Sequence, residues 1–129
     1  MDKALFEIEQ SLNLALPVRS GPASRTVWNP HPKFKGVHLM HIITGADTDG
    51  RLSLHLVKVE PECSLEEHCH QDQLELHEVL QGEGECRVEG RHVVYVPGTL
   101  AVIPMGSRHE VVAGVNGLHI KALFTPALL

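Results

Sequence analysis

Short apolar runs alternate with turn residues along the chain from Val37 onward. Residues 37–44 and 51–60 are rich in β-branched and apolar side chains, and the Gly- and Asp-containing segment 45–50 between them predicts a hairpin. The same pattern predicts short strands over residues 74–80, 85–88, 92–96, 100–103, 110–112 and 118–124, with turns between them that include residues 82–84 and 116–117. Regularly spaced strands with glycine or proline turns are typical of a sandwich or barrel rather than of βαβ units. The pattern therefore predicts an all-β fold.

The predicted strand over residues 92–96 lacks the alternation expected when one face meets solvent, because Val93, Val94, Tyr95 and Val96 are all apolar or aromatic. Burial of both faces would explain this. The outer face of a barrel is then covered by another segment of the chain or by a second subunit. We therefore expect a homodimer, with a monomer whose N-terminal segment covers the sheet as the alternative.

The N-terminal segment follows a different period. Leu5, Ile8 and Leu12 recur at helical spacing within residues 2–16, and Pro17 provides a stop. This spacing predicts a short amphipathic helix.

An arm is predicted after this helix, because prolines and glycines interrupt residues 17–36. Trp28 lies in the arm, and its large apolar ring is expected to pack on the barrel or on a partner subunit. We therefore expect a helix and arm over residues 1–35 and a barrel over residues 36–129. Together they form one domain, as is usual for a chain of 129 residues.

Four residues have the spacing of a metal site. His68 and His70 are separated by one residue, Glu75 follows, and His109 lies much further along the chain. Alternate side chains of an extended strand share a face, so His68 and His70 are expected to project together. Three imidazoles and one carboxylate suit a divalent first-row ion and leave two octahedral positions open. We predict that these residues bind one ion of Fe, Mn, Ni, Co, Cu or Zn; the alternative is a solvated pair of histidines on a strand.

These residues also carry a resemblance to a known family. The segment that begins at His68 resembles the first cupin motif, and the segment that ends at His109 resembles the second. The matching patterns are His68-x-His70-x4-Glu75-x6-Gly82 and Gly98-x5-Pro104-x-Gly106-x2-His109.

Two positions depart from the family's motifs. Glu62 stands where the first motif begins with glycine, and Ala113 stands where the second often ends with asparagine. Neither is a ligand position in the family, so the departures concern turn geometry rather than metal binding. The resemblance covers about residues 36–125. It implies a double-stranded β-helix, also called a jelly roll or cupin barrel, with His68, His70, Glu75 and His109 as metal ligands.

The resemblance leaves the activity open, because the family includes dioxygenases, isomerases, epimerases, lyases, sensor modules and storage proteins. Our first hypothesis is a metal-dependent, dioxygenase-like enzyme that acts on a small polar organic molecule. One alternative is a non-catalytic ligand-binding or sensing protein. Another is a redox-neutral isomerase or lyase that acts on a sugar acid. A small molecule is the expected partner in each case.

His77 is the predicted catalytic residue. It shares strand parity with Glu75, so both side chains are expected to face the metal. A neutral imidazole beside a bound substrate can move a proton at pH 7. The alternative is a structural histidine with both ring nitrogens satisfied.

The sequence does not decide which other histidines line the pocket. His55 and His119 lie within predicted strands and are favoured over His31 and His92, which lie in or beside turns. A surface or interface position is expected for His38 and His41. Arg51 and Arg108 are candidates for binding a substrate carboxylate through two hydrogen bonds, although exposed arginines usually only solvate a surface.

Composition excludes several classes of protein. The net charge of −5 and the scattered basic residues argue against nucleic-acid binding. No stretch approaches the ~20 apolar residues that a bilayer-spanning helix needs, so no membrane association is expected. The odd number of cysteines, with no Cys-x-x-Cys pair, predicts neither a disulfide framework nor a thiolate zinc site. A cytoplasmic location is therefore expected.

Overall fold

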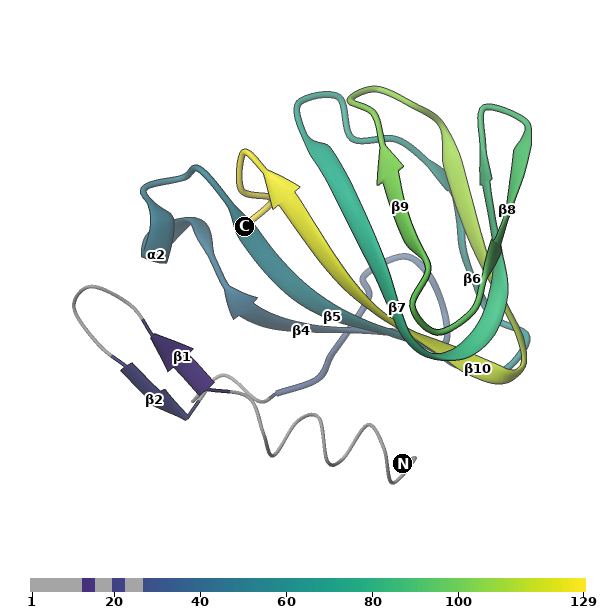
Figure 1. Ribbon diagram of the computed structural model, residues 1–129, viewed down its shortest axis with the longest axis horizontal. Helices are drawn as coiled ribbons and strands as arrows, with labels where there is room; N and C mark the ends of the chain where they lie inside the picture. The colour runs from purple at the N-terminus through teal and green to yellow at the C-terminus, as the bar shows by residue number, and fades with distance from the viewer. Residues whose placement is uncertain (1–12, 16–19, 23–26) are drawn as a thin grey trace.

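The structure is a computed structural model that describes residues 13–15, 20–22 and 27–129 of the chain (Figure 1). Almost all regular structure in these ranges is β-strand, so the predicted all-β fold is confirmed. The strands are β1 (Asn13–Ala15), β2 (Ser20–Pro22), β3 (Asn29–Pro30), β4 (Val37–Ile43), β5 (Ser53–Val59), β6 (Ser64–His68), β7 (Leu74–Val88), β8 (Arg91–Tyr95), β9 (Leu100–Ile103) and β10 (His109–Thr125). The hairpin predicted from segment 45–50 is present, and its connection contains the short helix α2 (Gly45–Thr48).

The strands of the barrel form one eight-stranded sheet that curves into two halves, and the long strands β7 and β10 contribute to both halves. The C-terminal half of β10 pairs with β5 and with the first half of β7, and β4 and β3 continue this sheet beyond β5. The N-terminal half of β10 pairs with β6 and with the second half of β7, which also pairs with β8. β9 pairs with the first half of β7. The strands therefore wrap around one interior as a jelly roll (Figure 1).

Glycines allow the two long strands to pass from one half of the barrel sheet to the other without ending. Gly82 has a φ of +83°, and a Cβ at this position would overlap the carbonyl oxygen of Gly117. The turns predicted near residues 82–84 and 116–117 are wrong, because β7 and β10 continue through them. Glycine here permits close backbone approach and a bend, which the sequence pattern alone does not distinguish from a chain reversal.

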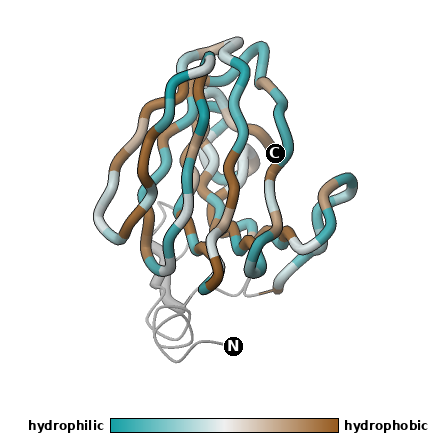
Figure 2. Tube along the Cα trace, turned by 90° about the vertical axis from the view of Figure 1, so that its right-hand side faces the viewer, coloured by the Kyte–Doolittle hydropathy of each residue, from teal (hydrophilic) through white to brown (hydrophobic). Residues whose placement is uncertain are grey.

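The barrel interior is built from the inward-facing side chains of most strands. Figure 2 shows hydrophobic and hydrophilic positions interspersed along the strands, as expected when only one face is buried. Glu75, His77 and Val79 of β7 are buried, whereas the alternate residue Glu78 pairs with Lys121 outside the barrel. The apolar core includes Val57, Val79, Val111, Leu118 and Ile120.

Trp28 packs on the outer face of β4 and β5. Its partly buried ring lies against a second apolar cluster formed by Met40, Ile42 and Leu56. The ammonium group of Lys58 lies 4.6 Å from the centre of the Trp28 ring, a cation–π contact. The expected docking of Trp28 therefore takes place on its own barrel.

In the single chain, only one face of the strand predicted over residues 92–96 is buried. Tyr95 is fully buried, but Val94 is 68% exposed and Val96 is 44% exposed. The inward face of β8 contributes Tyr95 to the core, and its outward face is apolar but uncovered in the single chain. Burial of the second face would need a partner subunit, so it stays a prediction.

Most of the predicted N-terminal helix, residues 2–12 and 16, lies outside the described residues. Its described part, Asn13–Ala15, forms β1 and pairs with β2, so the helix prediction is wrong there; cross-strand pairing overrides the helical periodicity. The domain division at residue 36 stays a prediction, although β3 of the predicted arm already joins the barrel sheet. Within the described ranges, no helix has the length and apolar character needed to cross a membrane.

Candidate metal centre

Three histidines from two strands and a loop converge at one end of the barrel interior. His68 ends β6 and His109 begins β10, and the two are register partners with ring centroids 4.3 Å apart. The ring of His70 lies 5.1 Å from that of His68 and 5.8 Å from that of His109. One ligand nitrogen from each histidine lies within 4.8 Å of the other two. Three nitrogens this close can bind a single divalent ion.

His70 is placed by a loop and not by a strand. The prediction that His68 and His70 share one strand is wrong for His70, because β6 ends at His68. Instead, the backbone N–H of Gly106 donates a hydrogen bond of 2.9 Å to the carbonyl of His70. Gly106 has a φ of +76° and belongs to the turn that precedes His109. The turn of the second motif therefore fixes a histidine of the first.

Backbone carbonyls fix the ring nitrogens that His68 and His109 offer. Nδ1 of His68 lies 2.7 Å from the carbonyl oxygen of Glu66, and Nδ1 of His109 lies 3.0 Å from that of Ser107. A carbonyl only accepts hydrogen bonds, so each Nδ1 must carry the proton. In the neutral ring the lone pair is then on Nε2. This arrangement is typical of metal-binding histidines.

Glu75 completes the cluster from β7. Its side chain is buried, with Oε1 lying 3.2 Å from Nε2 of His109 and 3.8 Å from Nε2 of His70. Burial raises the pKa of the carboxyl, but the imidazoles of His109 and His77 outweigh this and hold the pKa well below its usual value. Glu75 is therefore a carboxylate at neutral pH. The same carboxylate outweighs burial at His109 and raises the pKa of that imidazole.

His77 lies behind Glu75 in a buried chain of hydrogen bonds. Nε2 of His77 donates to Oε2 of Glu75 at 2.6 Å, and Nδ1 accepts from the hydroxyl of Tyr95 at 2.7 Å. Both ring nitrogens are therefore engaged, although the side chain also lines the cavity. The role of Tyr95 is not predictable from the sequence. Tyr95 shares an apolar strand with ordinary core residues, so no local signal marks it.

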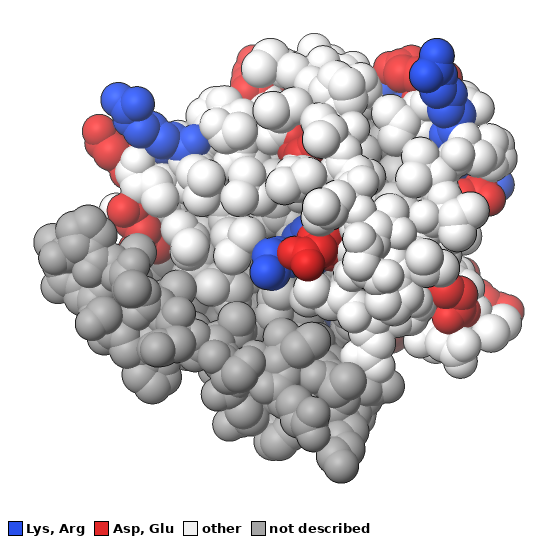
Figure 3. Space-filling model, viewed as in Figure 1, with Lys and Arg blue, Asp and Glu red and all other residues white. Residues whose placement is uncertain are grey.

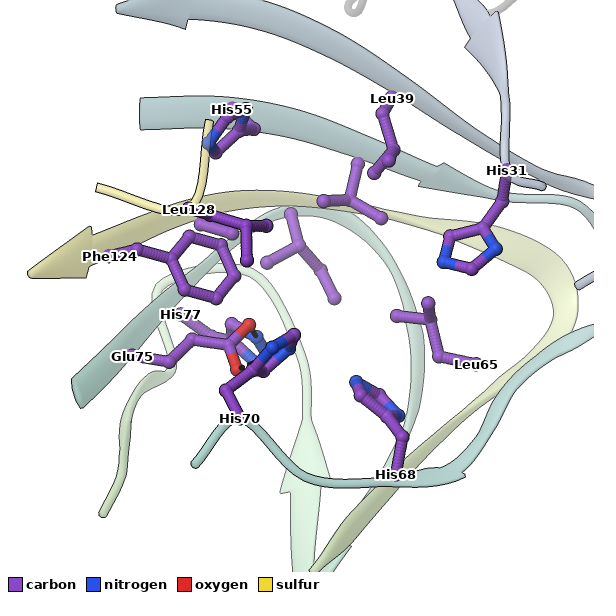
Figure 4. Close-up of a pocket in the computed structure, with 13 residues that line it drawn as sticks. His31, Leu39, His55, Leu65, His68, His70, Glu75, His77, Phe124 and Leu128 are labelled. Carbon is purple, nitrogen blue, oxygen red and sulfur yellow. Dashed lines mark hydrogen bonds and ion pairs between the residues drawn. The ribbon is translucent and has the colours of Figure 1, made fainter. Parts of the chain in front are cut away.

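The cluster opens into a cavity of about 80 Å³ inside the barrel (Figure 4). Its polar lining includes His68, His70, Glu75 and His77. The remaining wall is mostly apolar, with Phe124 and Leu128 among its members. The cavity is smaller than the roughly 300–1,000 Å³ of sites for drug-sized ligands. It is therefore suited to a molecule of few non-hydrogen atoms.

His55 also lines the cavity, as favoured from its place within a strand. Its Nδ1 lies 2.8 Å from Nδ1 of His41, and its Nε2 lies 2.8 Å from the hydroxyl of Ser53. Burial, followed by the neighbouring His41, lowers the pKa of His55 to about 4. The imidazole of His55 is therefore neutral at pH 7.

The positions of the other histidines relative to the cavity agree only partly with the expectation. His31 lines the cavity although it lies in a turn, whereas the favoured His119 does not line it. The cavity face of β10 carries Ile120, Ala122 and Phe124, so His119 falls on the opposite face. The described lining also lacks His38, His92, Arg51 and Arg108. Arg108 instead pairs with Glu67 on the surface.

Residues 55–124 match the family model for the cupin domain. This match spans more than half of the chain. The chain belongs to the cupin family. No curated protein matches this cupin in sequence.

Several solved structures share the fold. KdgF from a Halomonas species is 24% identical with a TM-score of 0.68, over 78% of this chain and 86% of that chain. A protein described as a predicted oxalate decarboxylase from Thermotoga maritima is 20% identical with a TM-score of 0.73, over 81% and 96%. Ectoine synthase from P. lautus is 19% identical with a TM-score of 0.65, over 73% and 67%. At these identities the likeness establishes the fold and no activity.

The ligand set of this cupin fits a divalent ion. Oε1 of Glu75 and Nε2 of His109 are buried, and no described residue forms a hydrogen bond with either atom. Their separation is 3.2 Å. Neighbouring ligands of an octahedral ion, each at about 2.1 Å, lie about 3.0 Å apart. Two buried polar atoms at this separation, without a hydrogen bond to any described residue, are explained if both face an ion.

Proposed function

We propose that this cupin is a metal-dependent enzyme that acts on a small, oxygen-rich organic acid, with His68, His70, Glu75 and His109 as the ligands. One observation carries the proposal. Backbone carbonyls bind Nδ1 of His68 and of His109, so the lone pair of each ring is on Nε2, beside the Glu75 carboxylate. These ligands open into a cavity, which a purely structural metal site does not need. A divalent ion held there would act as a Lewis acid and, if redox-active, as an electron donor to dioxygen.

The residues around the ligands have separable tasks. Glu75 supplies a negative charge that favours retention of the ion, and His77 holds its second oxygen, Oε2. The apolar wall formed by Leu39, Phe124 and Leu128 excludes bulk water from the cavity. Exclusion of water strengthens the electrostatic interactions between a bound acid and the cluster.

Oxidative cleavage by dioxygen is the first reaction to test. A redox-neutral isomerisation or elimination is the second candidate, and a specific observation favours it. The chain from Tyr95 through His77 to Glu75 consists of groups that can pass a proton by exchanging donor and acceptor roles. In either reaction His77 is the proposed proton-carrying residue, reaching the ligand shell through Glu75.

The test begins with untagged protein, from which metal content is measured by mass spectrometry. We expect about one divalent transition-metal ion per chain and less than a tenth of this in His68→Ala. His92→Ala is the matched control, because His92 is exposed and absent from the cavity lining. An unchanged metal content in His68→Ala would refute the ligand set.

Activity is tested on the metal-loaded protein with a panel of small hydroxy and keto acids. Substrate-dependent oxygen uptake identifies the oxidative reaction. Incorporation of solvent deuterium at carbon, observed by NMR without oxygen uptake, identifies the redox-neutral one. A metal-loaded protein that binds an acid and shows neither signal is a binding protein and not an enzyme.

We further propose that the chain forms a homodimer through the outer faces of β8 and β9. Both are edge strands among the described elements, and they carry the exposed apolar side chains Val94, Leu100 and Val102. Val93 of β8 and Leu100 of β9 line one surface groove, so the two strands are neighbours. Figure 3 shows one face of the molecule with its charged groups mostly near the margins. An apolar edge of this kind favours pairing with a second copy.

A cytoplasmic location is proposed on the basis of the cysteines. All three, Cys63, Cys69 and Cys86, are free thiols. Free thiols are usual in a reducing compartment.

A further inference from the structure

His31 uses one ring nitrogen to hold its own loop. Its Nδ1 lies 3.0 Å from the backbone nitrogen of Lys33 and 3.2 Å from that of Phe34. Backbone N–H groups only donate, so Nδ1 accepts both hydrogen bonds. The proton of the neutral ring is therefore on Nε2. Burial, and then the charge of Lys33, lower the pKa of His31, which favours this neutral form.

The second nitrogen of His31 is available to a ligand. The ring stacks on Phe34 with centroids 4.5 Å apart, which limits its rotation. His31 lines the cavity, and Figure 4 shows its ring projecting from the side opposite Glu75 and Phe124. No described group accepts a hydrogen bond from its Nε2. A fixed donor without a protein partner thus faces the cavity away from the carboxylate of the metal cluster.

The charges of the cavity limit what can sit beside His31. None of the described residues that line it is Lys or Arg, and Glu75 is the single carboxylate among them. A divalent ion together with Glu75 gives a net charge of about +1, which one carboxylate of a ligand neutralises. A second carboxylate near the neutral His31 would be buried without a counter-charge, which is costly. The group that meets His31 is therefore uncharged.

We propose that His31 is a specificity-determining residue whose Nε2–H donates a hydrogen bond to a neutral oxygen at the far end of the substrate. The substrate class is a small monoanionic acid that binds the ion through its carboxylate end and carries a hydroxyl, carbonyl or amide oxygen at the other. This inference rests on the proposed function, because it assumes that the carboxylate end binds the metal cluster. It assigns the arm before the barrel a role in choosing the substrate.

Three four-carbon acids provide matched probes. 2-Hydroxybutanoate, 2,4-dihydroxybutanoate and malate share the same 2-hydroxy acid end and differ only at C4, which is a methyl, a hydroxymethyl or a carboxylate group. Affinities are measured by isothermal titration calorimetry on the metal-loaded protein. We expect 2,4-dihydroxybutanoate to bind about fivefold to tenfold more tightly than 2-hydroxybutanoate, the usual effect of one hydrogen bond. Malate is expected to bind no more tightly than 2-hydroxybutanoate.

Two variants separate hydrogen bonding to the ligand from support of the loop. In His31→Asn the side-chain oxygen takes the place of Nδ1 and can still accept from Lys33 and Phe34, but the donor at the Nε2 position is lost. In His31→Gln a donor remains near the Nε2 position, but the loop acceptor is lost. We expect the preference for 2,4-dihydroxybutanoate to disappear in His31→Asn and to persist in His31→Gln. The affinity of His31→Asn for 2-hydroxybutanoate is expected to match that of the wild type.

The inference would be overturned if the wild-type protein bound 2,4-dihydroxybutanoate no more tightly than 2-hydroxybutanoate. It would also be overturned if the preference for 2,4-dihydroxybutanoate persisted in His31→Asn and was lost in His31→Gln. Failure of all three acids to bind the metal-loaded protein would refute the substrate class as well. Absence of metal from the wild-type protein would instead refute the proposed function, so the two failures are distinguishable.

Discussion

His77 donates a hydrogen bond of 2.6 Å to Glu75, and the far side of its ring accepts one from Tyr95. These two hydrogen bonds orient Glu75 so that its other oxygen, Oε1, faces the histidine cluster. In carboxylate–histidine metal sites, partners of this kind tune affinity although they do not touch the ion.

The change Tyr95→Phe removes the hydroxyl and leaves Nδ1 of His77 buried without a donor. We expect the free energy of unfolding, measured by urea denaturation of the metal-free protein, to fall by about 1–3 kcal/mol. Metal affinity, measured by competition with a chelator, is expected to fall about tenfold. An unchanged metal affinity would show that the Tyr95 hydroxyl serves stability alone.

The buried His55 predicts a pH dependence of stability. Its pKa is about 4 in the folded protein, against 6.5 for an ordinary histidine, mainly because of burial. Between these values the unfolded chain binds more protons than the folded one, so the free energy of unfolding rises with pH from about 4 to 6.5. We expect His55→Gln to remove roughly 2 kcal/mol of this rise in chelator-treated protein. Urea denaturation at pH 4.5 and 7 checks this; parallel curves for both proteins would contradict it.

Glu62 adopts a backbone conformation that favours glycine, with a φ of +62°. This is the position at which the first family motif begins with glycine, and its backbone N–H donates to the carbonyl of Gly114. We expect Glu62→Gly to raise the free energy of unfolding by about 0.5–1 kcal/mol, because left-handed backbone costs a residue with a Cβ. Thermal denaturation is the measurement. Glu62→Ala is the control; an equal gain in that variant would point to the charge and not the backbone.

The exposed edge formed by β8 and β9 predicts the effect of a charge placed on it. Leu100 is 66% exposed in the single chain. We expect sedimentation to show a dimer for the wild type and a monomer for Leu100→Glu, because a buried unpaired carboxylate opposes association. Val115→Glu places the same charge at a similarly exposed residue on β10 and should stay dimeric. A monomeric wild type would refute the proposed interface.

The sequence predicted the features that depend on local periodicity. Strand alternation predicts that Glu75 and His77 both point into the barrel, as observed. The sequence predicts turns at Gly82 and Gly117, because a glycine that allows two backbones to touch looks the same in sequence as one that reverses the chain. The difference depends on what packs against it, which is a tertiary property.

All three histidines that the structure brings together at the candidate site can be recognised in the sequence by their spacing. Tyr95 and the cavity position of His31 cannot. Tyr95 contacts His77 only once residues far apart in the chain are paired. The ring of His31 is held by hydrogen bonds from the backbone of its own turn. Neither arrangement leaves a periodic signal. Such supporting residues are found only when the strands are in place.

The hydrogen bond from Gly106 to the carbonyl of His70 joins two loops that are distant in sequence. The histidine cluster is thus built from β6, β10 and these mutually braced loops, whereas His31 and Leu39 at the other side of the cavity belong to the segment before β5. Mutations at His31 and Leu39 can reshape that side of the cavity without replacing any of the proposed metal ligands. Substrate preference and retention of the proposed ion are therefore expected to be separable by mutation.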